Sequence, residues 1–403
     1  MNKNELHEIG ICESDTFEDA AIIYKELYIC YFVRRKQKRE TEESFDFARK
    51  AGVYIDELVR RLTDYSFHID KFNKFKIHNP ERIINAPDEI DRLGEFWLCH
   101  KYVKPYLMGL LKPRDDLIQT DINLFPRLYV NNMACQEGKG SAETMRRMDL
   151  ALSQAHILYG NDFYVFQYDV KKFYDNIAHD VAKELFKELP LCAYKTLCNV
   201  IDSYKCTADN PNCYAIKDNP DRTYGLPKGT LVSQWVGVKL LDDLDRALSE
   251  LRGAIFVIRY MDDCVCFFRT KYEARHAMEF TQIYLERANL GIKLNSEKTS
   301  YYKVSRGINF CGWNYTVMPD HTVIKRLITK KKKEQYGRFK DIQHLYRNNI
   351  ITYEQVVSKY RGIFAHLSHG DTFRLRRYYQ NRFYLSHSKK HDKEDYNEKE
   401  KNC

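Results

Sequence analysis

The chain has 403 residues, of which 44% are hydrophobic and 30% are charged, and its formal net charge is +9. This length allows a sizeable core and two or three subdomains. No apolar run of membrane length and no signal peptide is visible, which argues against a membrane-embedded or secreted protein, and the twelve cysteines form no Cys-x-x-Cys pair. We therefore expect a cytoplasmic protein with free thiols, and the positive charge fits a polyanionic partner.

Two stretches in the first seventy residues, Phe17 to Phe32 and Glu42 to Leu62, show helical periodicity. Basic side chains cluster just after the first stretch, from Arg34 to Arg39, and again in Lys325 to Lys333 and Arg374 to Arg377. Tyr and Phe are abundant beside these runs, which suits stacking on bases or sugars. We nevertheless assign most of the aromatic residues to the core.

Acidic residues stand at the ends of apolar runs. The run from Phe163 ends on Asp169, and a helix is predicted from Asp175 to Leu185. Later, two runs flank Tyr260-Met261-Asp262-Asp263, and they are Ala254 to Ile258 and Cys264 to Phe268. Because both are short and rich in β-branched and aromatic residues, they predict buried strands joined by a tight β-hairpin.

Three carboxylates at strand ends predict a metal site. The neighbouring pair Asp262 and Asp263 repel each other, and hard cations such as Mg²⁺ are the usual compensation. Two-metal nucleotidyl transfer needs acids from separate strands that hold cations roughly 3.5–4 Å apart. Asp169 supplies the third acid. For the Asp-Asp pair taken alone, a plain surface turn remains the alternative.

The segments around these acids are less informative. Two helices and a polar loop, Thr207 to Arg222, are predicted before the hairpin. A zinc site is an alternative for this region, although the spacing of its cysteines is unlike that of zinc ribbons or fingers. Its candidate ligands are Cys192, Cys198, Cys206 and Cys213. Tyr272 to Leu290 predicts an amphipathic helix that stops at Gly291. The nearly all polar tail, Ser386 to Cys403, is predicted to be disordered.

The blocks of this sequence follow one another in an order that resembles bacterial stand-alone reverse transcriptases, from about Lys76 to about Arg377. The resemblance rests on Asp169-Val-Lys-Lys-Phe-Tyr174, Gly225-Leu-Pro-Lys-Gly-Thr-Leu-Val-Ser-Gln234, Tyr260-Met-Asp-Asp263, Gly291 to Thr299, Phe310-Cys-Gly-Trp313, and Ser358-Lys-Tyr-Arg-Gly362 with His366. It implies an α+β right-hand polymerase with fingers, an antiparallel-sheet palm and a short helical thumb.

The resemblance also implies roles for individual residues. Asp169, Val170, Asp262 and Asp263 would bind two Mg²⁺ ions, for which Mn²⁺ could substitute. Tyr174 would exclude a ribose 2′-hydroxyl and so select dNTPs, and Lys298 would protonate the departing pyrophosphate. The remaining implied contacts to the dNTP come from Val170, Phe173, Lys228 and Gly229, and the implied primer grip consists of Phe310, Gly312 and Trp313.

Two upstream blocks resemble the fingers, Arg82-Ile-Ile-Asn-Ala-Pro87 with Asp91-Arg92, and the template-contacting loop from Tyr129 to Ser141. An Arg is common where Gln136 stands, so we expect triphosphate contacts from Arg82 or Lys139, or from nearby Lys74 and Lys76. Lys228 stands where many relatives carry an uncharged residue, and it could contact a phosphate or alter fidelity. Ser233-Gln234 replaces the more common Ser-Pro, a variant associated with diversity-generating retroelements and with abortive-infection and defence enzymes.

The expected organisation has five parts. They are an N-terminal helical fingers extension (1–75), fingers (76–160), a palm with the catalytic acids and primer grip (161–315), a thumb (316–385) and a disordered charged tail (386–403). This division leaves no stretch for an RNase H, zinc-ribbon endonuclease or integrase domain.

The expected activity is RNA-directed DNA synthesis from dNTPs on an RNA template, which we predict to be a dedicated noncoding RNA, with phage defence as the favoured role. A retron or a diversity-generating retroelement is the alternative, and an accessory protein or an oligomer stays open. A viral-type RNA-dependent RNA polymerase usually has an Asp where Tyr174 stands and a Gly where Met261 stands. An inactive RNA-binding scaffold would be expected to have lost the acids or Lys298.

Overall fold

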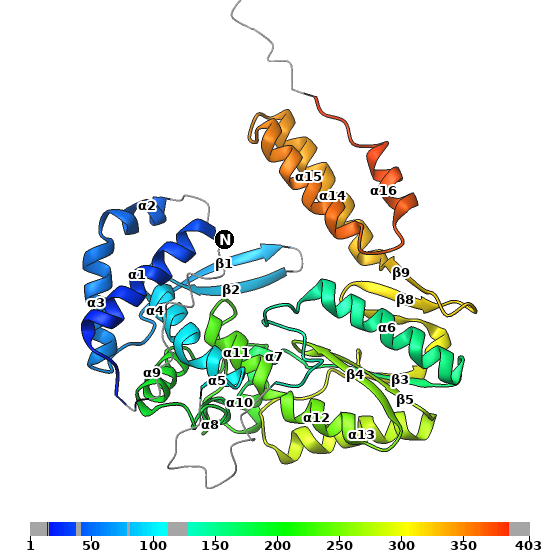
Figure 1. The fold of residues 1–403 in the computed structure, drawn as a ribbon, viewed down its shortest axis with the longest axis horizontal. Helices are drawn as coiled ribbons and strands as arrows, with labels where there is room; N and C mark the ends of the chain where they lie inside the picture. The colour runs from blue at the N-terminus through cyan, green and yellow to red at the C-terminus, as the bar shows by residue number, and fades with distance from the viewer. Residues whose placement is uncertain (1–13, 15, 38–41, 79–80, 112–127, 387–403) are drawn as a thin grey trace, which may run out of the picture. The chain divides into compact units, whose positions relative to one another are not determined.

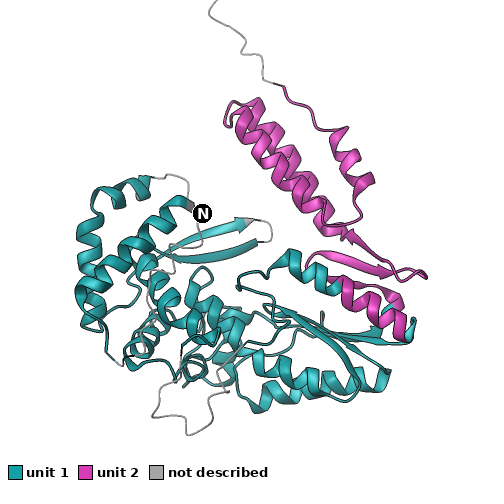
Figure 2. Cartoon of the chain, in the orientation of Figure 1, with its two compact units in different colours: residues 1–148, 159–304 teal, residues 149–158, 305–403 magenta. Residues whose placement is uncertain are grey.

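The protein is described from a computed structural model that covers residues 14, 16–37, 42–78, 81–111 and 128–386 (Figure 1). The chain divides into two compact units (Figure 2). The larger unit comprises residues 1–148 and 159–304, and the smaller unit comprises residues 149–158 and 305–403. Helix α6 (Ser141–Tyr159) contributes residues to both units.

The larger unit contains a four-stranded antiparallel sheet in the order β4-β5-β3-β6. Its strands are β3 (Tyr164–Asp169), β4 (Ala254–Tyr260), β5 (Asp263–Phe268) and β6 (Ser300–Lys303). Helix α12 (Asp242–Glu250) contacts β4, and α13 (Lys271–Arg287) contacts β3, β5 and β6 (Figure 1). The antiparallel sheet beside helices agrees with the predicted α+β class, whereas the division into fingers, palm and thumb stays a prediction.

The predicted hairpin is present between β4 and β5. Tyr260 pairs with Asp263, and Met261 in the turn has a φ of 59°. That left-handed conformation is uncommon for a residue other than glycine, and neighbouring contacts must hold it. Helix α13 begins after a capping box of Thr270 and Glu273. It ends at Arg287, before the predicted stop at Gly291, and Asn289 already has a φ of 49°.

The first part of the larger unit is helical around a two-stranded antiparallel ribbon, β1 (Phe72–His78) and β2 (Glu81–Pro87). The helix predicted over 42–62 is divided at Lys50, and the helices here are α1 (Ala20–Gln37), α2 (Glu42–Arg49), α3 (Ala51–Thr63) and α4 (Glu89–Leu98). A π-helical turn (Cys99–Val103) and α5 (Lys104–Leu107) follow α4. The apolar faces of these helices join the main core through side chains such as Leu27, Leu58 and Trp97.

The helix predicted from Asp175 to Leu185 is wrong as a single element. The chain forms α7 (Phe173–Asn176) and α8 (His179–Glu184) with extended backbone at Ile177 and Ala178 between them. The break occurs because Ile177 accepts a 2.9 Å hydrogen bond from the backbone N of Gly225, while the N of His179 donates to Thr223 O. Further on lie α9 (Leu191–Asp202), α10 (Ala215–Asp218) inside the predicted polar loop, and α11 (Leu231–Leu240).

In the smaller unit, the described residues after 304 form a three-stranded antiparallel sheet and three helices, and residues 149–158 of α6 belong to the same unit. The strands are β7 (Ile308–Phe310), β8 (Trp313–Val317) and β9 (Val323–Leu327), and the helices are α14 (Thr329–Arg347), α15 (Tyr353–Leu367) and α16 (Phe373–Gln380). A 3₁₀ turn, Val304–Arg306, precedes β7. Phe339 of α14 packs among three aromatic rings, and the distances between its ring centroid and theirs are 5.0–5.8 Å. These rings belong to Tyr360 of α15, Tyr379 of α16 and Phe383 after α16.

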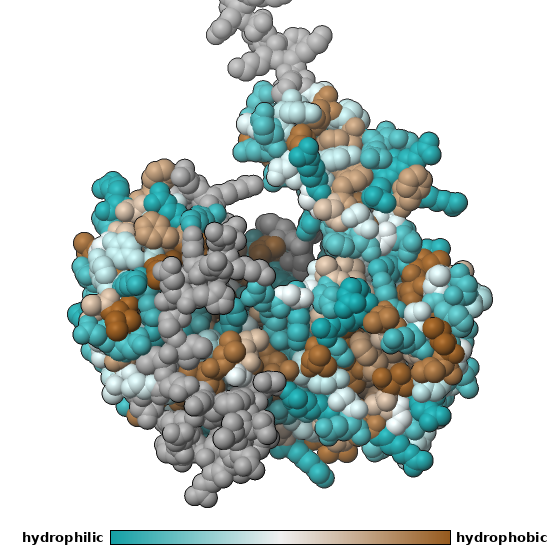
Figure 3. Space-filling view, in the orientation of Figure 1, coloured by the Kyte–Doolittle hydropathy of each residue, from teal (hydrophilic) through white to brown (hydrophobic). Residues whose placement is uncertain are grey.

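The ten cysteines within the described residues are free thiols. Cys192 belongs to the main core, while Cys206 and Cys213 belong to a separate small apolar cluster. None of the helices within the described residues has both the length and the apolar character of a membrane span. On the face shown in Figure 3, hydrophilic residues predominate and hydrophobic ones gather in small groups. The predicted disorder of the tail falls outside the described residues, apart from Ser386.

Candidate active site

Two of the three predicted metal-binding acids stand directly opposite each other. Asp169, the last residue of β3, pairs with Asp263, the first residue of β5. Opposed residues of an antiparallel pair have Cβ atoms about 4.5–5.5 Å apart, so these carboxylates reach the same space. Asp262 lies next to them in the hairpin turn. Strand pairing therefore brings together acids that are more than ninety positions apart in the sequence.

The acids of this cluster perturb one another. Burial raises the pKa of Asp262, and the charge of Asp169 raises it further. Burial also raises the pKa of Asp263 to about 7, and both neighbouring acids add to this shift against an opposing hydrogen bond from Gln167. Lys298 and Arg82 lower the pKa of Asp262 in part. Burial and mutual repulsion thus both disfavour the charged forms of Asp262 and Asp263, and carboxylates perturbed in this way are common at functional sites.

Lys298 and Asn295 hold the carboxylate of Asp169. Lys298 Nζ lies 2.9 Å from Oδ1, and Asn295 Nδ2 lies 3.0 Å from Oδ2. The backbone N of Asn295 also donates to Asp169 O at 2.8 Å, while Asn295 O accepts from the N of Lys298. The turn that follows Gly291 therefore places the predicted proton donor on the predicted metal ligand.

The cluster fits a divalent cation by its chemistry. Among the residues that the structure describes, no three or more His, Cys, Asp or Glu side chains form a group that could hold a metal ion as they stand, and the Asp169 carboxylate is bonded to Lys298 and Asn295. The donors are nevertheless carboxylates, which Mg²⁺ prefers. The raised pKa values of Asp262 and Asp263 also mark charge that a cation would compensate. Val170, the fourth predicted ligand, is buried and forms an isolated bridge with Leu294.

The predicted sugar gate, Tyr174, lies near the acids. Burial raises its pKa, and the charge of Asp262 adds to that effect. Its ring packs against α11, where a Cβ built on Gly237 would lie 3.2 Å from the Tyr174 hydroxyl and 3.0 Å from the ring of Phe173. The backbone O of Tyr174 accepts a 2.8 Å hydrogen bond from Leu226 N. The segment from Asp169 to Tyr174 is therefore in direct contact with the segment from Gly225 to Gln234.

The segment from Gly225 to Gln234 also contacts strand β2. Gly229 has a φ of 137°, and a Cβ there would lie 2.8 Å from Ile84 and 3.0 Å from Asn85 O, so only glycine fits without displacement. The adjacent backbone O of Lys228 accepts from Asn85 N at 2.8 Å. The ammonium group of Lys228 forms an ion pair with Asp175. This gives the unusual lysine an internal partner, and its contact to the dNTP stays a prediction.

The expected triphosphate contacts differ in their surroundings. Arg82 is exposed on β2 and lies close enough to Asp262 to lower the pKa of that acid. Lys139 instead donates to Asn132 O at 3.0 Å, and Gln136 donates to the same oxygen at 2.6 Å. Burial lowers the pKa of Lys139 to about 8. On β1, Lys74 is exposed and Lys76 pairs with Glu81.

Sequence reasoning missed Arg259, which precedes the hairpin turn. The side chain is fully buried, and its Nε lies 2.7–2.8 Å from both carboxylate oxygens of Asp245 on α12. Nη2 donates to Val238 O on α11 at 2.9 Å, and Nη1 donates to Met261 O at 2.7 Å. Burial raises the pKa of Asp245 to about 7, against the opposing effect of Arg259. The feature of the sequence that could have identified Arg259 is its position as a single Arg within an apolar strand.

The backbone of Arg259 makes a second set of contacts. Its N donates to Asn131 O at 3.1 Å, and its O accepts from Met133 N at 2.9 Å, so the loop after Tyr129 runs beside β4 as a parallel bridge. Arg259 therefore connects this loop, α11 and α12 to the turn that carries Asp262. It also supplies a hydrogen bond that holds the left-handed Met261 in place.

Gln167 is a second residue that the sequence reasoning passed over. Its Nε2 donates to Asp263 Oδ1 at 3.3 Å, and its Oε1 accepts from the hydroxyl of Tyr302 on β6 at 3.0 Å. Gln167 lies two residues before Asp169, and alternate residues of a strand share one face. The two-residue spacing from Asp169 could therefore have identified Gln167 as a neighbour of the acids.

The predicted primer grip forms the β7–β8 hairpin of the smaller unit. Phe310 pairs with Trp313, and both are buried. Cys311 and Gly312 have φ values of 50° and 84°, as a tight turn requires. The Trp313 ring fills the space beside Gly370, where a Cβ would lie 2.2 Å from it.

The family model described as reverse transcriptase (RNA-dependent DNA polymerase) matches residues 115–315. The match includes the acid cluster, Lys298, Tyr174 and the β7–β8 turn. No curated protein matches the chain in a sequence search. The chain therefore carries a reverse transcriptase domain, which makes it an RNA-directed DNA polymerase.

Proposed function

We propose that this domain makes cDNA by two-metal nucleotidyl transfer, with Asp169, Val170, Asp262 and Asp263 as the metal ligands. The observation that carries this proposal is the pairing of Asp169 with Asp263 across β3 and β5. Two Mg²⁺ ions, or Mn²⁺ in their place, would activate the attacking 3′-hydroxyl and stabilise the leaving oxygen when bound. The raised pKa of Asp263 supports this assignment, because such a carboxylate gains most from a cation.

The chain's own residues have three further roles in this proposal. Lys298, now bonded to Asp169, donates a proton to the departing pyrophosphate. Tyr174 excludes nucleotides with a 2′-hydroxyl, while Arg82 attracts the triphosphate toward Asp262. Phe310, Gly312 and Trp313 form the primer grip, which holds the 3′ end of the primer. Phe173 and Gly229 support these contacts by packing against α11 and β2.

We assign the chain to a right-hand polymerase. In this assignment residues 1–75 extend the fingers, 76–160 form the fingers, 161–315 form the palm and 316–385 form the thumb. The antiparallel sheet that carries the acids, and the helices that follow β9, support this division.

We also propose that the template is a dedicated noncoding RNA and that the enzyme acts in phage defence. Ser233-Gln234 supports a position among the defence and diversity-generating groups. Ser233 bonds Thr230 inside the N-terminal turn of α11, and Gln234 Oε1 lies 3.7 Å from Cys135 Sγ in the loop after Tyr129. A retron or a diversity-generating retroelement remains the alternative.

The test is primer extension on an RNA template with the Asp262→Asn/Asp263→Asn variant. Incorporation of dNTPs should be abolished while RNA binding is retained. Asp243→Asn, which changes an exposed acid of α12, is the matched control and should remain active. Retained synthesis by the double variant would remove the metal assignment. Sequencing the nucleic acid that copurifies with the protein would identify template and product, and a mixture of unrelated cellular RNAs would contradict a dedicated template.

A further inference from the structure

The positive charge of the protein is concentrated in the smaller unit. Residues 149–158 and 305–403 contain 21 Lys and Arg and 11 Asp and Glu, so this unit has a formal charge of +10, whereas the whole chain has +9. The larger unit is therefore close to neutral as a whole. A partner that is attracted by net charge is expected to bind the smaller unit.

Four basic side chains of this unit line one pocket, which we call the β9–α16 pocket. It has a volume of about 850 Å³, and its lining comes from β9, α16, the turn before α16 and the start of α14. Its cations are Arg326, Lys332, Arg374 and Arg376. Among the described residues, none of these side chains has an ion pair or a hydrogen bond, and the Nε of Arg376 is buried without an acceptor. The pocket therefore presents donors that the protein itself leaves unsatisfied.

The acids of the same unit compensate little of this charge. Its described residues include six acids, of which Asp371 lines the pocket and accepts from the backbone N of Lys325 at 2.7 Å. The other five are Asp149 and Glu334, which pair with Lys325 and Lys331, Asp320 in the turn between β8 and β9, Asp341 in the lining of a different pocket, and Glu354 in the first turn of α15. One acid thus faces four cations in the β9–α16 pocket.

The start of α16 adds two features that suit a nucleotide strand. The Thr372 hydroxyl donates to Leu367 O at 2.5 Å instead of capping the helix, and the first turn contains no acid. The N–H groups of an uncapped first turn and the helix dipole both favour a phosphate. Phe373 lines the same pocket and is 68% exposed. An exposed ring beside cations is suited to stacking on an unpaired base.

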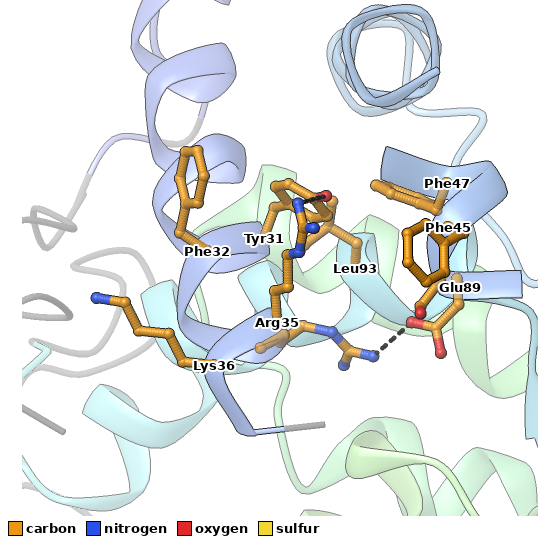
Figure 4. A pocket seen from close by; sticks show the side chains of 10 residues that line it. Tyr31, Phe32, Arg35, Lys36, Phe45, Phe47, Glu89 and Leu93 are labelled. Atoms are coloured by element: carbon orange, nitrogen blue, oxygen red, sulfur yellow. Dashed lines mark hydrogen bonds and ion pairs between the residues drawn. The ribbon is translucent and has the colours of Figure 1, made fainter. Parts of the chain in front are cut away.

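The pocket between α1, α2 and α4 of the larger unit differs from this one (Figure 4). Its Arg34 forms a 3.1 Å ion pair with Glu89, which also lines that pocket. Its Arg35 donates from Nη1 to the Tyr31 hydroxyl at 3.3 Å. Both arginines therefore have internal partners, whereas the four cations of the β9–α16 pocket do not.

We propose that the β9–α16 pocket binds the backbone phosphates of a single nucleic-acid strand through its four cations, while Phe373 stacks on an unpaired base. The strand is the RNA template or the DNA product, both of which a reverse transcriptase domain handles. Basic surfaces combined with aromatic rings are how proteins hold single strands. Residues 387–403, which follow the described part of the chain, contain five Lys and five acids, so they bring no net negative charge to the pocket.

The test is the affinity of the full-length protein for fluorescent oligo(U) and oligo(dT) of equal length, measured by anisotropy over a range of salt concentrations. Arg374→Gln/Arg376→Gln should lower the magnitude of the slope of log K against log salt by about 1.4, because each lost phosphate contact on a single strand lowers it by about 0.7. Since phosphate contacts contribute little at 1 M salt, this corresponds to a loss of affinity of roughly 25-fold at 0.1 M. Phe373→Ala should weaken binding roughly five-fold or more without changing the slope.

The matched control is Arg252→Gln/Lys271→Gln, which removes the same charge from exposed positions of the larger unit and should change neither quantity. A greater loss with oligo(U) than with oligo(dT) assigns the pocket to the RNA, and the reverse assigns it to the DNA. Unchanged affinity and slope in both pocket variants would overturn the proposal and favour an acidic protein segment as the occupant. An equal loss in the control would also overturn it, because net charge alone would then account for binding.

Melting temperatures check that each variant is folded, and the exposed position of Phe373 makes its variant the safer of the two. Extension of a saturating short template-primer should proceed at the parental rate in both pocket variants, because their residues are outside the proposed active site. If the parent protein extends no primer but the pocket variants lose affinity as expected, the proposed catalytic function fails and the pocket assignment stands.

Discussion

Arg259 offers the sharpest separation of stability from positioning in this domain. The perturbation is Arg259→Met, which removes the guanidinium but keeps an unbranched side chain. Arg259 and Asp245 are both fully buried, and the substitution leaves the Asp245 carboxylate without its cation. Breaking a buried pair by removing one partner typically costs about 3–5 kcal/mol. That is a large part of the roughly 5–15 kcal/mol that stabilises a folded domain.

The second variant adds Asp245→Leu to Arg259→Met. Because neither charge is then buried, most of the lost stability should return. The hydrogen bond from Nη1 to Met261 O does not return, and the hairpin turn that carries Asp262 loses its support. We therefore expect the double variant to unfold near the denaturant concentration of the parent protein, while its rate of dNTP incorporation stays low and its half-saturating Mg²⁺ concentration rises.

The assays are denaturant unfolding and primer extension at a series of Mg²⁺ concentrations. Arg259→Lys is a useful third variant, because one ammonium group cannot reach Asp245, Val238 O and Met261 O together. It should fall between the parent and Arg259→Met in stability. The reasoning is refuted if the double variant regains parental activity and Mg²⁺ dependence together with its stability, since Arg259 would then matter only for folding.

Three further outcomes are expected. Tyr174→Val should raise rNTP use relative to dNTP use by roughly 10–200-fold, because it removes a steric block from the binding pocket. Tyr174→Phe keeps the ring and should keep the ratio. Competition assays with dNTP and rNTP mixtures measure both ratios. Lys298→Gln should lower the rate of single-turnover incorporation by a factor of about 10²–10⁴, and Lys298→Arg should be less affected. Melting temperatures should barely change, because the exposed pair with Asp169 contributes only about 0–1 kcal/mol to stability. Equal rates in both variants and the parent protein would exclude proton donation. The folded-state pKa of Asp263 is raised to about 7, so its favourable contribution to the metal-free protein is full below its unfolded value near 4 and is lost as pH rises through about 7. Mg²⁺ binds the ionised form, so the rise in melting temperature on adding Mg²⁺ should be small at pH 6 and larger at pH 8; a rise independent of pH, or one retained by Asp263→Asn, would contradict this.

The buried acid Glu95 shows why that experiment compares samples with and without Mg²⁺. Burial raises the pKa of Glu95 to about 7, although its Oε1 accepts a 2.8 Å hydrogen bond from Val232 N at the start of α11. Its contribution to stability is also lost as pH rises through about 7. Since Glu95 is not among the proposed metal ligands, its effect should cancel in the difference.

The local elements and the chemical type of the site could be predicted from the sequence. Short apolar runs rich in β-branched residues predicted the strands, and the acids at their ends predicted the turn of the hairpin, because alternation and turn chemistry are local properties. Helix ends were predicted less well. The break at Ile177 depends on a hydrogen bond from Gly225, which lies nearly fifty residues further along the chain.

Which residues surround the acids depends on long-range packing and could not be predicted from the sequence. Asp245 and Asn295 carry no distinguishing local pattern, and each gains its role from a partner on another element. The ammonium groups of Lys228 and Lys139 bond Asp175 and Asn132 O, partners that the sequence did not indicate, while their contacts to the nucleotide stay a prediction. A charged group that is withdrawn from water takes the nearest internal partner, and which partner is nearest depends on strand register and helix packing. Spacing along the chain does not encode that distance.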